Sequence, residues 1–396
     1  MRNLIICLDG TWNTPDQRDR DRQIPSNVVK IARAVATKTP AQQPTQVVYY
    51  DTGVGTAGLL DRLIGGVTGH GISENIRTAY RWLIEYFQED DRLFLFGFSR
   101  GAYSARSLAG LIGICGIPRA SGRSVDSLVK EAYTIYRDKT PKRRDSESKQ
   151  FRRDSKAVRA TVHFIGVWDT VGALGVPTGG PIGWWTRRRS GFHDVDLGAH
   201  IKHAFHALAI NERRGPFQPA LWSTKESNHG QVIVQAWFPG VHSNVGGGYV
   251  DSGLSDRTLL WMIYNASAHG LLFDENYIDL CVRPNWFGEL RDSMQLPYRL
   301  MLWDRPRDRA IGSVCPESEH LHISVPERWT NVTSPDNPPT HVVDLIDSMT
   351  HHGSPWEENF NLANRAKLTN HHQQYAVCNA QSDRSVDPAH GSKPNE

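Results

Sequence analysis

Short apolar runs bounded by Gly, Asp and Asn recur through the first 240 residues, and helical patterns lie between several of them. Buried strands of parallel sheets are nearly continuous apolar segments, whereas amphipathic helices repeat their apolar positions every three or four residues. The apolar runs predict strands at 4–8, 46–50, 93–98, 161–168 and 232–238. Their alternation with helical segments predicts an α/β fold with a mostly parallel central sheet and helices on both faces.

Four segments have helical patterns, at 27–36, 73–87, 102–114 and 200–210. The last of these contains three histidines at i, i+3 and i+6, which are His200, His203 and His206. On a helix that spacing spreads the imidazoles over too wide an arc to bind one metal ion. We expect these histidines to lie on a partly buried structural face.

Two parts of the chain depart from this alternation. Residues 137–159, within an insertion at 118–160, contain ten Lys or Arg and four Asp or Glu. Such a stretch is usually a mobile, solvated loop, and the alternative is a lid or surface that meets anionic lipid head groups.

From residue 271 the pattern fades into Trp-containing and Pro-containing sequence. We expect an α/β domain at 1–270, an irregular appendage packed on it at 271–378, and a disordered tail at 379–396.

Composition narrows the classes of function. The 396 residues include 45 Lys or Arg and 42 Asp or Glu, giving a net charge of +3. So small a net charge gives no reason to expect nucleic acid as a partner. The five cysteines are widely spaced without a C-x-x-C motif, which indicates free thiols in a reducing compartment and no zinc ribbon. We expect neither a metal ion nor a cofactor.

The apolar segments are too short for the membrane. None approaches the about 18 to 20 apolar residues that span a bilayer. Five apolar residues before Asp9 are too few for the core of a signal peptide. The sequence therefore predicts a cytoplasmic protein, or one exported by a route that needs no cleaved signal.

The strongest chemical signal is the pentapeptide GFSRG at 97–101, between an apolar strand and a helix of small residues. A serine nucleophile on a sharp strand-to-helix turn needs glycines on both sides, since a Cβ there would collide with neighbouring backbone. The turn exposes the serine hydroxyl at the carboxyl end of the sheet. We therefore expect Ser99 to be the nucleophile of a hydrolase, and the alternative is a tight structural turn.

A hydrolase of this architecture has an acid and then a histidine after the serine in the chain. Asp169 follows the strand at 161–168, and His242 lies in a Gly-rich loop four residues after the strand at 232–238. We expect His242 to act as base and then acid, and Asp169 to orient its imidazole. Asp169 could instead cap a turn, and the other candidates for the acid are Asp194, Asp196, Asp251 and Asp256.

The oxyanion of such a reaction needs two backbone N–H donors. One is expected from Arg100, the residue after the nucleophile. The loop after the strand at 4–8 should give the other, from Gly10 or Thr11. We expect Asp9 to be a carboxylate that orders this loop.

Four motifs occur in order: LDGTWN at 8–13, GFSRGA at 97–102, GVWDTVG at 166–172 and FPGVHSNVGGGY at 238–249. Together they resemble the uncharacterised α/β-hydrolase family that includes the catalytic domains of type VI secretion phospholipase effectors of the first lipase group. The resemblance covers residues 1–270. It implies an α/β-hydrolase fold and a triad of Ser99, Asp169 and His242. An Asp is expected in related sequences where Asn244 stands.

These features predict a serine ester hydrolase, of lipase or phospholipase type, that works through an acyl-enzyme. The expected partners are an ester or lipid substrate and, peripherally, an anionic membrane surface. An esterase acting on carbohydrate or other small molecules is one alternative. A binding protein that keeps the fold without catalysis is another, because fold does not imply function. The sequence does not set the oligomeric state.

Overall fold

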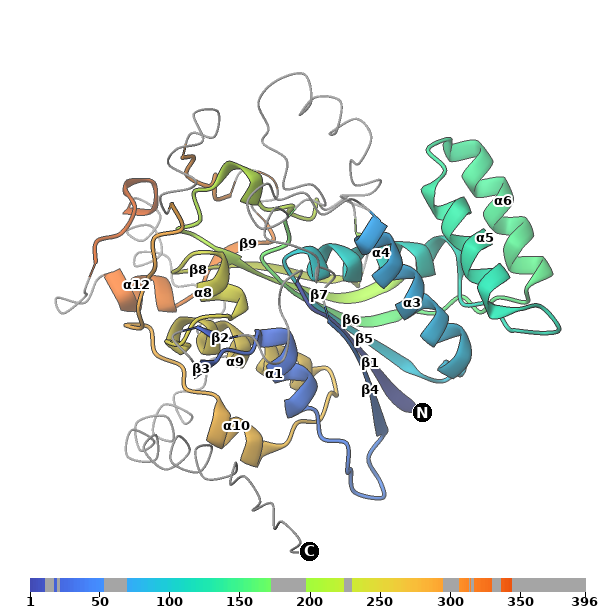
Figure 1. Cartoon of the computed structure of the whole chain (residues 1–396), viewed down its shortest axis with the longest axis horizontal. Coiled ribbons are helices and arrows are strands. Elements are labelled where there is room, and N and C mark those ends of the chain that lie inside the picture. Colours follow the sequence, from blue (N-terminus) through green and yellow to red (C-terminus); the bar gives the residue numbers. More distant parts are fainter. Residues whose placement is uncertain are drawn as a thin grey trace, which may run out of the picture. The chain divides into compact units, whose positions relative to one another are not determined.

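Seven strands form one sheet, in the order β4-β1-β5-β6-β7-β8-β9, in the computed structural model of the chain (Figure 1). The strands are β1 (Arg2–Leu8), β4 (Thr45–Asp51), β5 (Arg92–Phe98), β6 (Val162–Trp168), β7 (Ile201–Ala209), β8 (Val232–Phe238) and β9 (Glu319–Leu321). Every neighbouring pair in this sheet is parallel. A separate antiparallel pair joins β2 (Arg18–Asp19) to β3 (Arg22–Gln23). The predicted α/β class with a mostly parallel sheet is confirmed.

The structure describes residues 1–10, 18–19, 22–52, 70–171, 197–223, 230–294, 306–312, 314, 317–329 and 336–343. Contacts divide the chain into two units, Met1–Pro339 and Thr340–Glu396. The sheet belongs to the first unit. The tail expected at 379–396 lies outside the described residues.

The two faces of the sheet are both buried, as the continuous apolar strands require. In β1, Leu4 and Ile6 belong to one apolar cluster and Ile5 and Cys7 belong to the other, because successive side chains alternate across a strand. In β5 the alternation repeats in Leu93, Phe94, Leu95 and Phe96. The result is a three-layer arrangement with a core on each side of the sheet.

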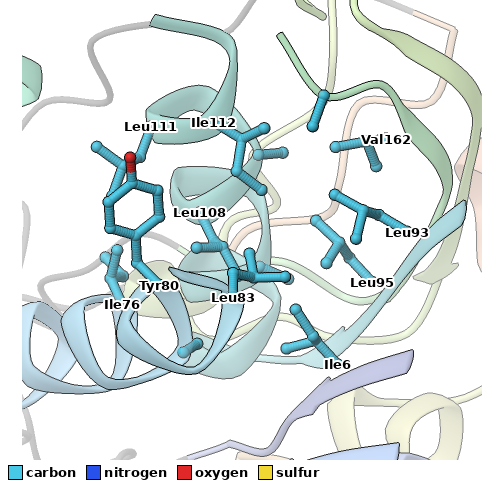
Figure 2. Close-up of a cluster of buried hydrophobic side chains, with 14 of the residues drawn as sticks. Ile6, Ile76, Tyr80, Leu83, Leu93, Leu95, Leu108, Leu111, Ile112 and Val162 are labelled. Carbon is cyan, nitrogen blue, oxygen red and sulfur yellow. The ribbon is translucent and has the colours of Figure 1, made fainter. Parts of the chain in front are cut away.

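Helices α3 (His70–Tyr86) and α4 (Arg100–Cys115) cover one face, and α1 (Asn27–Ala34) and α9 (Gly253–Ala268) cover the other (Figure 1). The amphipathic pattern of α3 turns one row of side chains inward. Figure 2 shows this row opposite the apolar side chains of α4 and beside those of the strands; the labelled residues of α3 are Ile76, Tyr80 and Leu83. This packing sets the position of α4, whose first turn follows Ser99.

The segment predicted as a helix at 200–210 is the strand β7. It pairs in parallel with β6 and with β8 and is buried on both faces. Consequently His203 and His206 point to opposite faces: the ring of His203 lies 3.8 Å from that of His269, and the ring of His206 lies 5.3 Å from that of Trp222. The helical prediction was wrong because an apolar run buried on both faces has no period of its own to distinguish it.

The charged insertion is helical, which corrects the expectation of a mobile loop. Helix α5 (Val125–Arg137) packs four buried apolar side chains on α3 and α4. Helix α6 (Pro141–Asp154) is mostly exposed, but its Phe151 is buried and its Arg152 donates to the carbonyl oxygen of Ile114 at the end of α4. Because the many charges of α6 mask its few anchoring residues, the sequence pattern does not reveal this helix.

The region after residue 270 contributes to the sheet. Helix α10 (Glu275–Cys281) is followed by β9, which pairs with β8, and by α12 (Ser324–Trp329). Residues 271–339 therefore belong to the same unit as the sheet. Among the described residues, no helix is both long and apolar enough to cross a membrane.

Candidate active site

Ser99 occupies a sharp turn between β5 and α4. Its φ of 57° lies in the left-handed region that residues other than glycine rarely adopt. A Cβ on Gly97 would lie 2.5 Å from the carbonyl oxygen of Gly101, and a Cβ on Gly101 would lie 2.1 Å from that of Leu8. Both glycines are therefore required by the close approach of backbone, as the pentapeptide predicts.

The sheet brings the three predicted residues to one edge. Ser99 and Asp169 directly follow neighbouring parallel strands, and the Ser99 N–H donates to the carbonyl oxygen of Trp168 at 3.0 Å. His242 is the first residue of the short helix α8 (His242–Gly246), four residues after β8 ends. Because the carboxyl ends of parallel strands share an edge, side chains separated by up to 143 residues meet there.

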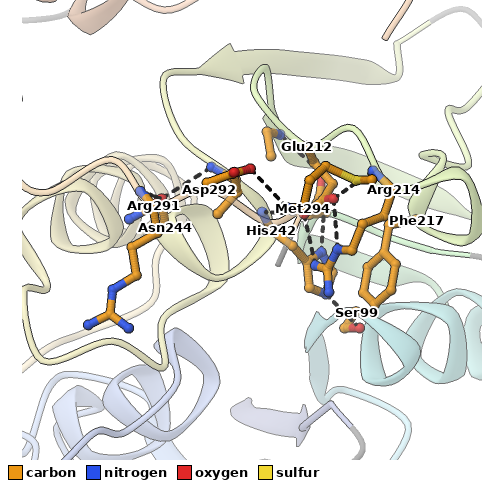
Figure 3. A network of polar contacts seen from close by, with 12 residues as sticks. Ser99, Glu212, Arg214, Phe217, His242, Asn244, Arg291, Asp292 and Met294 are labelled. Carbon is orange, nitrogen blue, oxygen red and sulfur yellow. Dashed lines mark hydrogen bonds and ion pairs between the residues drawn. The ribbon is translucent and has the colours of Figure 1, made fainter. Parts of the chain in front are cut away.

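A continuous chain of hydrogen bonds joins these side chains. His242 Nδ1 lies 2.5 Å from Asp169 Oδ2. On its other side, His242 Nε2 lies 2.8 Å from Ser99 Oγ, and Figure 3 labels both of these residues. A carboxylate only accepts, so the imidazole proton belongs on Nδ1 and the Nε2 lone pair faces the Ser99 hydroxyl, which donates to it. This arrangement can withdraw a proton from the serine.

Asp169 is wholly buried and tightly bound. Arg309 donates to it twice, from Nη1 to Oδ1 at 2.5 Å and from Nη2 to Oδ2 at 3.0 Å, and the Ala209 N–H donates to Oδ1 at 3.1 Å. Burial alone would raise the pKa of Asp169. The positive charge of Arg309 and the hydrogen bond from His242 outweigh that effect and hold the pKa well below its usual range. The carboxylate therefore stays ionised.

His242 is held by its backbone as well as by its ring. The carboxylate of Glu212 accepts from the His242 N–H at 3.2 Å and from Arg214 through both of its oxygens. The rings of Phe98 and Phe217 lie 4.6 and 5.0 Å from the imidazole. Burial lowers the pKa of His242, and the hydrogen bond to Asp169 opposes this only in part. The imidazole is therefore neutral at neutral pH, the state a general base needs.

The loop expected to give the oxyanion donors is ordered by Asp9. Asp9 Oδ1 accepts from the Gly10 N–H at 2.7 Å, and Oδ2 accepts from the hydroxyls of Ser26 and Tyr50 at 2.6 and 2.9 Å. The Gly10 N–H thus points to Asp9, while Thr11 lies outside the described residues. Arg100 opens α4 directly after Ser99. The loop-ordering interpretation of Asp9 agrees with these contacts.

The other acids considered for the role of Asp169 lie elsewhere. Asp251 accepts from the N–H groups of Gly253 and Glu289. Asp256 is buried in an ion pair with Lys30. Asp194 and Asp196 lie outside the described residues. Of the candidates that the structure describes, Asp169 is the one bonded to His242.

Asn244 ties the loop of His242 to a distant segment. Its side-chain amide donates to the carbonyl oxygen of Glu289 at 3.0 Å, and its Oδ1 accepts from the N–H groups of Val241 and Arg291 at 3.2 and 3.3 Å. An aspartate could not make the first of these bonds. Asn244 therefore has a structural task that uses its amide group.

Sequence reasoning missed Arg309, Glu212 and Arg214. All three lie outside the four motifs, and Arg309 comes from the region expected to be an appendage. Neither a motif nor a spacing connects Arg309 to Asp169, which is 140 residues away. Only the folded chain brings the two together.

Comparison with known proteins gives matches over much of the chain. The solved structures include an uncharacterized protein from Pseudomonas aeruginosa (TM-score 0.42, 18% identity, 70% of this chain and 47% of that one). Another is the Tle1 effector bound to the VgrG spike of the Type 6 secretion system (TM-score 0.36, 19% identity, 63% of this chain and 51% of that one).

The uncharacterized protein YEL023C of Saccharomyces cerevisiae is 26% identical over 260 residues, covering 58% of this chain and 35% of that protein. The chain thus spans about a third of that curated relative's length. The model of the family described as "T6SS, Phospholipase effector Tle1-like, catalytic domain" matches residues 2–265. The chain belongs to this family.

Proposed function

We propose that the protein is a serine ester hydrolase of lipase or phospholipase type. The observation that carries the proposal is the hydrogen-bond chain from Ser99 Oγ through His242 to Asp169, with distances of 2.8 and 2.5 Å. Membership of a family described by a phospholipase effector domain supports a hydrolase. A lipid ester is the substrate class that fits this description best.

In the proposed reaction His242 Nε2 takes the proton of Ser99 as Oγ attacks the ester carbonyl carbon. The C–O bond to the alcohol then breaks, and His242 returns the proton to the leaving oxygen. Water, deprotonated by the same imidazole, attacks the acyl-enzyme and releases the acid and Ser99. Throughout, the Asp169 carboxylate stabilises the imidazolium, and the N–H of Arg100 is a donor to the oxyanion.

The proposed substrate surface is an anionic membrane. The basic tip, which we define as residues 137–144 between α5 and α6, has five basic residues and one acidic residue. Arg137 lies close enough to Tyr103, one turn after Ser99, to influence its pKa, whereas Arg152 reaches the far end of α4. The basic tip is therefore on the Ser99 side of α4. Its charge suits contact with anionic head groups near the site.

Two other functions would use the same fold. An esterase for carbohydrate or other small molecules would share the catalytic residues, and a binding protein would not turn over any ester. Labelling of the wild-type protein by a fluorophosphonate separates the binding protein from both enzymes. A panel of phospholipid vesicles and soluble esters separates the two enzymes.

The decisive variant is Ser99→Ala. It should lose fluorophosphonate labelling and the hydrolysis of short p-nitrophenyl esters, by a factor on the order of 10⁴ to 10⁶. Ser107→Ala is a matched control, since this serine lies two turns further along α4 and is also buried. Hydrolysis by the Ser99 variant at the wild-type rate would refute the proposal.

A further inference from the structure

Arg309 is a buried cation in a segment that no motif connects to the site. Only 1% of its surface is exposed. Besides its two bonds to Asp169, Nη1 donates to the carbonyl oxygen of Ala209 at 2.7 Å and Nη2 donates to that of Phe217 at 2.5 Å. Its fork thus joins Asp169 to the end of β7 and to the turn that carries Phe217 against His242.

These contacts fill the acceptor sites of Asp169. A carboxylate has about four lone-pair directions, and the donors here are two N–H groups of Arg309, the Ala209 N–H and His242 Nδ1–H. With three of the four fixed by Arg309 and the backbone, the carboxylate plane cannot rotate. Oδ2 therefore stays directed at Nδ1 of His242.

The positive charge of Arg309 also affects the protonation state of His242. An unpaired buried carboxylate would strongly favour a protonated imidazole beside it. In this site the carboxylate already shares its negative charge with a guanidinium. The electrostatic gain on protonating His242 is therefore smaller than beside a lone aspartate.

We propose that Arg309 is a positioning residue that fixes the carboxylate plane of Asp169 and keeps His242 neutral into mildly acidic conditions. The inference rests on the proposed function of Ser99, Asp169 and His242. It adds a fourth residue that acts through Asp169 and touches no substrate.

The other charged and titratable groups around the pair are few among the described residues. Glu212 and Arg214 face His242, with opposite effects on its pKa. Arg106 lies near His206, which in turn is near Asp169. None of them is bonded to the carboxylate of Asp169. Removing the charge of Arg309 should therefore directly change the protonation equilibria of His242 and Asp169. Protonation of His242, and of Asp169 itself, then becomes easier.

The test is the pH dependence of fluorophosphonate labelling in Arg309→Gln and Arg309→Lys. Gln removes the charge, so we expect the acid limb to move about one pH unit or more to the alkaline side. Lys keeps the charge but cannot donate to both carboxylate oxygens as the guanidinium does. We therefore expect an acid limb near that of the wild type, with a labelling rate lower by about tenfold or more. Arg213→Gln is the control, because Arg213 forms an exposed ion pair with Asp308 of the same segment.

The outcomes distinguish this inference from the proposed function. If Arg309→Gln is labelled more slowly but the acid limb of its pH profile does not shift, the role of Arg309 is merely structural. If Arg309→Gln is labelled at the wild-type rate with the wild-type pH profile, Arg309 has no role in the site. If neither variant folds, the wild type decides: its acid limb should lie below pH 6.5, the approximate unperturbed pKa of histidine, and a limb above that value overturns the inference. Absence of labelling in the wild type would overturn the proposed function and this inference with it.

Discussion

Gly101 lies against Leu8, at the point where the first turn of α4 crosses the end of β1. A Cβ on Gly101 would lie 2.1 Å from the carbonyl oxygen of Leu8 and 2.5 Å from that of Asp9. All of the obstructing atoms are backbone, so no side chain can move aside. This contact sets the distance between Ser99 and the loop that Asp9 orders.

Gly101→Ala should therefore displace either α4 or the loop after β1. Overpacking of this kind costs about 1–3 kcal/mol of the free energy of unfolding, and the shift should also lower the rate of fluorophosphonate labelling. Gly110→Ala in the same helix is the control, because the atoms nearest to its Cβ would belong to the side chain of Tyr136, the closest at 3.3 Å. Urea unfolding and labelling rates measure both effects. Equal behaviour of the two variants would contradict the packing argument.

Asp169→Asn should reduce ester hydrolysis by a factor approaching about 10⁴, since an amide favours the wrong imidazole tautomer. Asp251→Asn is the control, because Asp251 binds backbone N–H groups away from His242. The measurement is kcat/KM for a short p-nitrophenyl ester. Equal losses in both variants would mean that the acid has been assigned wrongly.

The same substitution leaves Arg309 buried beside a neutral group. Removing one partner of a buried ion pair typically costs about 3–5 kcal/mol of stability. Asp169→Asn combined with Arg309→Met should therefore recover stability without recovering activity. This double variant separates unfolding from the loss of chemistry.

The sequence predicted the parts of the site that lie at strand ends. Ser99, Asp169 and His242 each follow an apolar run, and parallel strands place their carboxyl ends at one edge whatever the details of packing. Arg309 follows no strand and belongs to no motif. Its place beside Asp169 depends on the path of a segment that no local pattern determines.

The fold shows the same division. Helix α3 was predicted from its amphipathic period, and the strands around Ser99 were predicted because they are short, nearly continuous apolar runs. The strand at 201–209 was mistaken for a helix because its burial on both faces removes the period-two signal. The helix α6 was missed because charge dominates its composition, although Phe151 anchors it.

His206 should make the protein less stable in acid. Burial, reinforced by the charge of Arg106, lowers its pKa to about 3, and its Nε2 accepts from the Thr170 N–H at 3.1 Å. In the unfolded chain His206 binds a proton near pH 6.5, whereas in the folded chain it does not do so until about pH 3. Between these values only the unfolded state is protonated, so the free energy of unfolding falls as the pH falls.

His206→Gln keeps an acceptor for Thr170 but removes the titration. Between pH 6 and pH 4, the slope of unfolding free energy against pH should decrease by about 1.4 kcal/mol per pH unit, the value for one proton. Chemical denaturation at several pH values gives this slope. An unchanged slope would show that His206 does not titrate differently in the two states.

The basic tip should affect the hydrolysis of lipid surfaces and not the chemical step. Residues 137–159 have a net charge of +6 from ten basic and four acidic residues, against +3 for the whole chain. Each Lys or Arg near an anionic bilayer contributes about 1 kcal/mol, which salt screens over about 8–10 Å. Lys139 and Lys142 are both exposed on the basic tip.

Lys139→Gln with Lys142→Gln should weaken hydrolysis of anionic phospholipid vesicles by roughly tenfold or more and reduce its salt dependence. Short soluble esters should be hydrolysed at the wild-type rate. The control is Arg119→Gln with Arg123→Gln, which removes the same charge before the start of α5, at the end opposite the basic tip. If both pairs reduce vesicle hydrolysis equally, net charge and not the basic tip is responsible. If the soluble esters lose activity to the same extent as the vesicles, the tip supports the fold and the membrane contact is refuted.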